Sequence, residues 1–115
     1  MTKFADLSER EEIIHTLHSW ANQHPEVRRV HIYGSRARGD HRLDSDIDVA
    51  IEIDPAQGDS GPFATWCYER INWQSGLAPN LPWPLHLEWY DPAGRTPTVA
   101  CKMAKGAYLA FERSV

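Results

Sequence analysis

Residues 34–49 read GSRARGDHRLDSDIDV, and this is the most informative stretch of the chain. It opens on Gly34-Ser35, where an alternating run over residues 27–33, typical of a strand, comes to an end. A helix is expected to begin there, and the free backbone N–H groups at a helix start favour an anion. Glycine lets a phosphate approach the backbone closely, and a serine hydroxyl can donate to a phosphate oxygen. The turn is therefore a candidate phosphate site.

Two aspartates, Asp46 and Asp48, close the same stretch and open the clearest strand pattern of the chain, residues 46–53. Side chains alternate between the two faces of a strand, so both carboxylates are expected on one face. Carboxylates held together repel each other, and a divalent cation such as Mg²⁺, which prefers oxygen ligands, offsets that repulsion. An Asp-x-Asp pair alone is more often the solvated face of an edge strand. Its place after a Gly-Ser turn and an Arg-rich turn favours a metal site.

Helix and strand patterns alternate on both sides of this stretch. The expected elements are a helix over residues 8–24, strands over residues 27–33, 46–53 and 85–90, a short helix from Ser35, a helix over residues 63–74, a short helix over residues 97–105 and a terminal piece over residues 107–111, extended or helical. The expected inward faces are Ile13, Ile14, Leu17, Trp20 and Ala21 on the first helix, and Phe63, Trp66, Cys67 and Ile71 on the helix over residues 63–74. This order predicts a two-layer α/β (α+β) domain.

Composition limits the functional classes. The 115 residues fit a single domain over 1–115. The net charge of −4 argues against nucleic acid as the main partner, because proteins that wrap duplexes carry clustered excess Lys and Arg. Two cysteines, Cys67 and Cys101, are expected to be reduced, partly buried thiols. The sequence has no secretory signal and no stretch of membrane-span length, so a cytoplasmic location without membrane contact is expected.

The spacing of the two motifs resembles a known family. Ten residues separate Gly34-Ser35 from Asp46-Ile47-Asp48, and the finer pattern is Gly-Ser-x-Ala-Arg-Gly followed by Ser-Asp-x-Asp and an aliphatic residue. In these features the chain resembles the minimal nucleotidyltransferases of the DNA polymerase beta superfamily, and its ending over residues 106–109 is similar to theirs. The resemblance implies a polymerase beta-like fold with a mixed sheet of three to five strands and helices packed on it.

The resemblance also implies roles for individual residues. Gly34 and Ser35 would hold the β- and γ-phosphates of ATP, the substrate. Arg38, which matches the signature arginine, would contact a phosphate or fix the loop. Asp46 and Asp48 would hold two Mg²⁺ ions, one activating the acceptor hydroxyl and the other orienting the triphosphate.

Families of this kind add a third carboxylate from a later strand. Glu88 fits that role by its face, because it alternates with the apolar residues Leu85, Leu87 and Trp89. The alternatives are that Glu88 is a solvated strand residue or that Asp91 is the third carboxylate.

Other polar residues near these motifs receive plainer interpretations. Arg36 and Arg42 are steering charges or, more simply, solvated loop residues. Glu52 shares the face of the two aspartates but lies farther along the strand, and it is expected to be structural. His31 and His86 fall on neighbouring strands and are not assigned to chemistry.

The chain has no room for a domain that selects the acceptor, so another polypeptide or a second subunit of a homo-oligomer must present it. Trp73 and Trp83 flank a proline-rich connection and would form a partner surface if exposed, or pack against the prolines if not. The resemblance implies an antitoxin that adenylylates a tyrosine of a small helical HEPN-type RNase toxin. The alternatives are a small-molecule or RNA-end acceptor, or a non-catalytic antitoxin or binding module.

Overall fold

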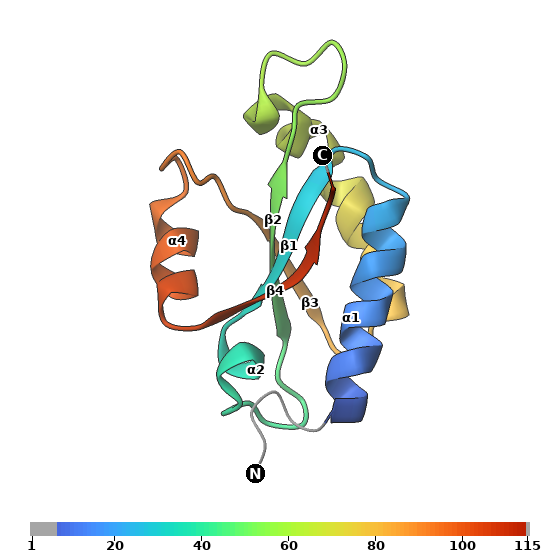
Figure 1. Ribbon diagram of the computed structural model, residues 1–115, viewed down its shortest axis with the longest axis vertical. Coiled ribbons are helices and arrows are strands. Elements are labelled where there is room, and N and C mark those ends of the chain that lie inside the picture. Colours follow the sequence, from blue (N-terminus) through green and yellow to red (C-terminus); the bar gives the residue numbers. More distant parts are fainter. Residues whose placement is uncertain (1–6, 115) are drawn as a thin grey trace.

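A computed structural model describes residues 7–114, with backbone only for Leu7 and Ser8 (Figure 1). The elements along the chain are α1 (Leu7–Asn22), β1 (Val27–Tyr33), α2 (Ser35–Arg38), β2 (Ile47–Ile53), α3 (Pro62–Leu77), the 3-10 turn η1 (Ala78–Asn80), β3 (Leu85–Trp89), α4 (Pro97–Ala104) and β4 (Ala107–Glu112). The terminal piece is therefore a strand. No helix in the described part of the chain has the length and apolar character needed to cross a membrane.

The four strands form one mixed sheet in the order β3-β2-β1-β4. β1 pairs antiparallel with both β2 and β4, and β2 pairs parallel with β3. This register sets Tyr33 opposite Asp48, and Asp48 beside His86. The expected mixed α/β sheet with helices packed on it is confirmed, and its register brings the ends of β1, β2 and β3 together.

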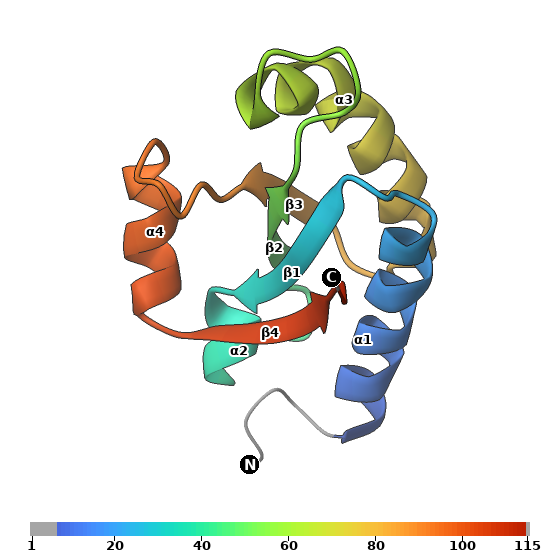
Figure 2. The same ribbon diagram turned by 45° about the horizontal axis from the view of Figure 1, so that its top comes forward.

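The main core lies on one face of the sheet, beneath α1 and α3, whereas α4 covers part of the opposite face (Figures 1 and 2). On α1 the buried residues are Ile13, Leu17, Trp20 and Ala21, as expected from their helical spacing, with Ile14 partly buried. The smaller core under α4 joins Val99 to Tyr33 and Ala50. The sheet therefore has two covered faces, and the candidate site residues lie on the α4 side.

The expected inward face of α3 is wrong except at Trp66. Phe63 is 53% exposed and Ile71 73% exposed. Cys67 is also exposed, as is Cys101 on α4, so the expected partial burial of the two thiols is wrong. The helix runs on to Leu77, and its buried stripe follows Trp66, Trp73 and Leu77 at spacings of seven and four residues. The stripe through Trp73 buries more apolar surface than the expected stripe, so it decides which face of the helix meets the sheet.

The expected surface at Trp73 and Trp83 is also wrong. Trp73 is 2% exposed and packs against Trp20 and Trp66, with ring centroids 6.3 and 6.4 Å apart. Trp83 is partly buried and lies 4.0 Å beneath the guanidinium of Arg36. The proline-rich connection is therefore folded onto the body of the domain.

This packing predicts unequal costs for two truncations on α3. Trp73→Ala removes a buried ring and should lower the free energy of unfolding by about 3–5 kcal/mol. Ile71→Ala, on the exposed side of the same helix, should change it by less than about 0.5 kcal/mol. Urea unfolding followed by far-UV circular dichroism measures both. A larger loss of unfolding free energy for Ile71→Ala than for Trp73→Ala would contradict this packing and support the face of the helix expected from the sequence.

Candidate active site

The first feature of the site is the contact between Gly34 and the carboxylate of Asp48. Gly34 follows the last residue of β1 and has a φ of +74°, a conformation that side-chain-bearing residues rarely adopt. A β-carbon built at this position would overlap Oδ2 of Asp48. Glycine is therefore required both by the backbone turn and by the space that the carboxylate occupies.

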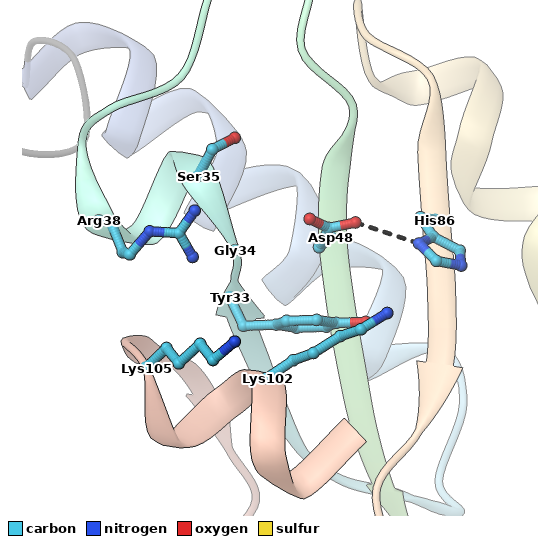
Figure 3. Close-up of a pocket in the computed structure, with 8 residues that line it drawn as sticks. All are labelled: Tyr33, Gly34, Ser35, Arg38, Asp48, His86, Lys102 and Lys105. Atoms are coloured by element: carbon cyan, nitrogen blue, oxygen red, sulfur yellow. Dashed lines mark hydrogen bonds and ion pairs between the residues drawn. The ribbon is translucent and has the colours of Figure 1, made fainter. Parts of the chain in front are cut away.

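A pocket of about 430 Å³ opens at this contact (Figure 3). Its lining comes from the end of β1, from α2, β2 and β3, and from α4 and the turn after it: Tyr33, Gly34, Ser35, Arg38, Asp48, His86, Lys102 and Lys105. Figure 3 shows Ser35 and Arg38 rising from α2, Asp48 and His86 on neighbouring strands, and the two lysines projecting from the α4 side. The structure thus places four of the expected site residues, Gly34, Ser35, Arg38 and Asp48, around one pocket.

His86 connects Asp48 to Glu88. Its Nδ1 lies 3.1 Å from Oδ1 of Asp48, and its Nε2 lies 2.9 Å from Oε2 of Glu88. Glu88 is on the expected face of the sheet, but it does not line the same pocket. It lines a neighbouring hollow of about 370 Å³ between β3 and α3, which shares His86 with the first. The imidazole ring thus occupies the space between the two carboxylates.

Asp46 is placed differently from the expectation. β2 begins at Ile47, one residue later than predicted, and the exposed Asp46 does not line the pocket. Because Asp46 precedes the regular pairing, strand alternation does not hold its carboxylate beside that of Asp48. The structure places Asp48 in the pocket and Glu88 two positions along β3 from His86, whereas the exposed Asp46 lies outside the pocket lining.

The carboxylates fit a divalent cation only in part. Within residues 7–114, no three His, Cys, Asp or Glu side chains form a ready-made metal cluster. Mg²⁺ commonly binds one or two carboxylates and takes its other ligands from water and substrate phosphates. Asp48, partly exposed beside Gly34 and Ser35, suits a cation of that kind. The residues fit a metal that arrives with phosphate oxygens rather than one held by protein ligands alone.

Arg36 is neither a steering charge nor a solvated loop residue. Its guanidinium is buried, with 1% exposure, and donates to Glu9 Oε1 at 2.6 Å and to the backbone oxygen of Ser45 at 2.9 Å. It also stacks on Trp83. One side chain therefore ties the loop before β2 to α1 and to the connection before β3, which fixes the approach of the chain to Asp48.

Glu52 and Asp91 both have structural partners. Glu52 is buried and pairs with Arg29 at 3.0 Å and with His31 at 2.6 Å, as expected for a structural residue. Asp91 is buried in its own turn, 2.7 Å from Arg95, and the Arg95 guanidinium together with backbone N–H groups lowers its pKa. Glu88 therefore remains the better-placed candidate for a third carboxylate.

Three residues that line the pocket were not predicted from the sequence: Tyr33, Lys102 and Lys105. Burial raises the pKa of Tyr33, and the carboxylates of Asp48 and Glu88 raise it further, so its hydroxyl stays neutral in the pocket wall. Two features of the sequence could have pointed to the lysines. They are two of only three lysines in the chain, and they lie three positions apart at the end of an expected helix.

Comparisons with known proteins identify a family and two solved structures with a similar fold. Residues 12–78, more than half of the chain, match the family described as polymerase beta, nucleotidyltransferase. A crystal structure of a toxin-antitoxin with AMP-PNP aligns with a TM-score of 0.61 and 18% identity, over 88% of this chain and 74% of that chain. A candidate nucleotidyltransferase from Sulfolobus solfataricus aligns with a TM-score of 0.54 and 18% identity, over 90% of this chain and 79% of that chain. At this identity both alignments show a shared fold. No curated protein matches the sequence significantly.

The contact at Gly34 predicts energetic coupling to Asp48. Gly34→Ala must turn the carboxylate aside, so its cost should fall by about 1 kcal/mol when Asp48→Ala is already present. Gly58→Ala is the matched control, because Gly58 also has a positive φ, +91°, but an added β-carbon there meets nothing within 4 Å. That control should show only backbone strain, about 1–2 kcal/mol, and no coupling to Asp48→Ala. Strictly additive losses for Gly34→Ala and Asp48→Ala in urea unfolding would contradict the contact.

Proposed function

The chain belongs to the polymerase beta nucleotidyltransferase family, and from this premise we propose that it transfers AMP from ATP to a hydroxyl of a partner protein. The observation that carries the proposal is the contact between Gly34 and Asp48. A turn suited to phosphate and a carboxylate suited to a divalent cation lie against each other in one pocket. That juxtaposition is what a nucleotide bound together with Mg²⁺ requires.

Each residue of the pocket has a role that follows from its chemistry. Gly34 leaves the space in which a phosphate can approach the backbone, and the Ser35 hydroxyl donates to a phosphate oxygen. Arg38, paired with Asp40 at 3.2 Å, adds positive charge at the same wall. Phosphoryl-type transfer depends mainly on positioning and electrostatic stabilisation, and these residues supply both.

Asp48, Asp46 and Glu88 are the residues that would hold Mg²⁺, and we propose two ions. When bound, the cations neutralise phosphate charge and make the attacked phosphorus more electrophilic. For all three carboxylates to serve, His86 must leave its place between Asp48 and Glu88, and the exposed side chain of Asp46 must turn toward the pocket. These two movements are the rearrangements that nucleotide binding has to produce.

The transfer itself balances without another reactant. The acceptor oxygen forms a bond to the α-phosphorus while the bond from that phosphorus to the bridging oxygen breaks. Pyrophosphate leaves, and the hydroxyl proton is released to the medium. The acceptor oxygen has to be held in line with the breaking bond, and positioning of this kind contributes much of the rate.

A partner protein is proposed to hold that acceptor. The described residues fold into one sheet with its helices and include no second domain that could bind an acceptor. The fold is shared with a toxin-antitoxin crystallised with AMP-PNP. We therefore propose an antitoxin that adenylylates a tyrosine of a helical HEPN-type RNase toxin. The exposed residues Phe63, Tyr68 and Ile71 on α3, rather than Trp73 and Trp83, are the apolar surface for that partner.

Metal dependence is tested by calorimetry with ATP. ATP should bind more tightly with Mg²⁺ than without it, because Asp48 would hold the cation and the cation would neutralise phosphate charge, and Asp48→Asn should abolish that gain. Asp54→Asn is the control, since this exposed carboxylate at the far end of β2 pairs with Arg28 and should leave the gain intact. Equal affinity with and without Mg²⁺ would contradict a metal-bridged site.

Transfer to a protein is tested with the product of the adjacent gene, if it encodes a small helical protein. With radiolabelled ATP and Mg²⁺ the chain alone should label itself weakly and label that partner strongly, and mass spectrometry should find one added AMP on tyrosine. Asp48→Asn should remove the label, whereas Asp54→Asn should not. If the partner is unmodified and the Asp48→Asn variant still neutralises its toxicity, the chain is a non-catalytic binding module. If the label appears on a small molecule or an RNA end, that molecule is the acceptor instead of a protein.

A further inference from the structure

The wall of the pocket formed by α4 and the end of α2 is positively charged. Arg38, Lys102 and Lys105 line the pocket, and Asp48 is the only carboxylate among its lining residues. This cluster stands out because the chain carries a net charge of −4 and has three lysines in all. Within residues 7–114, neither Lys102 nor Lys105 forms an ion pair with a carboxylate. Cations gathered in this way repel one another unless an anion lies between them.

The packing of α4 fixes where the lysines point. Val99 is buried against Tyr33 and Ala50, with Met103 packed beside them, so this side of the helix faces the sheet. Lys102 and Lys105 lie three positions apart and project into the pocket from the α4 side (Figure 3).

Gly106 brings Arg38 to the same wall. A β-carbon at Gly106 would approach Cγ of Arg38 to 3.0 Å, and Gly106 has a φ of +146°. The glycine after Lys105 thus lets the stem of Arg38 lie close against the end of α4. The three cations come from two separate parts of the chain, and this close approach holds them around one space.

We propose that Lys102 and Lys105, together with the Gly34-Ser35 turn, bind the β- and γ-phosphates of the nucleoside triphosphate. The triphosphate then runs from Asp48 and the Gly34-Ser35 turn toward α4, with its α-phosphate at Asp48. This inference rests on the proposed function and adds the direction in which the nucleotide lies. Lysine ammonium groups suit it, because they bind phosphate as mobile point charges with three donors each.

The direction of the triphosphate decides the side on which the acceptor enters. In an in-line displacement the attacking oxygen approaches opposite to the leaving group. Pyrophosphate that leaves along α4 therefore requires an acceptor from the β3 side, where the hollow containing Glu88 adjoins the pocket through His86. The lysines stabilise the charge that develops on the leaving pyrophosphate, and the α3–β3 side is left for the partner.

The test uses calorimetry of the full chain with two probes in Mg²⁺, ATP and inorganic tripolyphosphate. Lys102→Gln and Lys105→Gln should each weaken both probes about tenfold, the change expected when one charge-assisted contact is lost. Both lysines are exposed, so the variants should unfold at the same urea concentration as the wild type. Arg28→Gln, which removes the same charge at the far end of β1, should leave both affinities unchanged.

Several outcomes would overturn the inference. If ATP binding weakens but tripolyphosphate binding does not, the lysines contact the nucleoside rather than the terminal phosphates. If Arg28→Gln weakens binding of both probes as much as the lysine variants do, the lysines act only through the overall charge of the chain and not through a contact with phosphate. If the wild-type chain binds ATP but not tripolyphosphate, the proposed role of Lys102 and Lys105 is wrong. The same holds if the lysine variants bind both probes with unchanged affinity. In either case the proposed function is not contradicted. If the wild-type chain does not bind ATP, both the proposed role of the lysines and the proposed function are wrong.

Discussion

The antiparallel pairing that sets Tyr33 opposite Asp48 is the constraint on which the site depends. It brings the residue after Tyr33, Gly34, against the Asp48 carboxylate, where no other residue leaves enough room. The same pairing puts the Tyr33 ring into the pocket wall, and it orients β2 so that His86 lies beside Asp48 on the parallel neighbour. Burial of Arg36 then fixes the loop between the two strands from the other side. Phosphate turn and carboxylate are thus joined by the sheet itself rather than by flexible loops.

The parts of this arrangement that could be predicted from the sequence are those set by local spacing. The Gly-Ser and Asp-x-Asp motifs named three of the residues that line the pocket, Gly34, Ser35 and Asp48, and alternation placed Glu88 on the same face as Asp48. What could not be predicted depends on partners distant in sequence. Arg36 is buried because Glu9 and Trp83, from two other segments, enclose its guanidinium. The face of α3 was misassigned because Trp73 and Leu77 lay beyond the stripe that its first residues suggested.

The charges of the site are arranged in two groups. Asp48 and Glu88 lie on the strands, with His86 between them, whereas Lys102 and Lys105 come from the α4 side. The nucleotide and cation of the proposed function would complement both groups at once, with the phosphates facing the lysines and the cation facing the carboxylates. Such complementarity would offset the repulsion within each group of like charge. Binding and rearrangement of His86 are then parts of one equilibrium.

The most direct measurement is a crystal structure of the chain with Mg²⁺ and a non-hydrolysable ATP analogue. We expect the phosphates against Gly34 and Ser35, the terminal phosphates near Lys102 and Lys105, and a cation on Asp48 in place of its bond to His86. An analogue bound away from the Gly34–Asp48 contact, with His86 still joined to Asp48 and no cation there, would contradict the account.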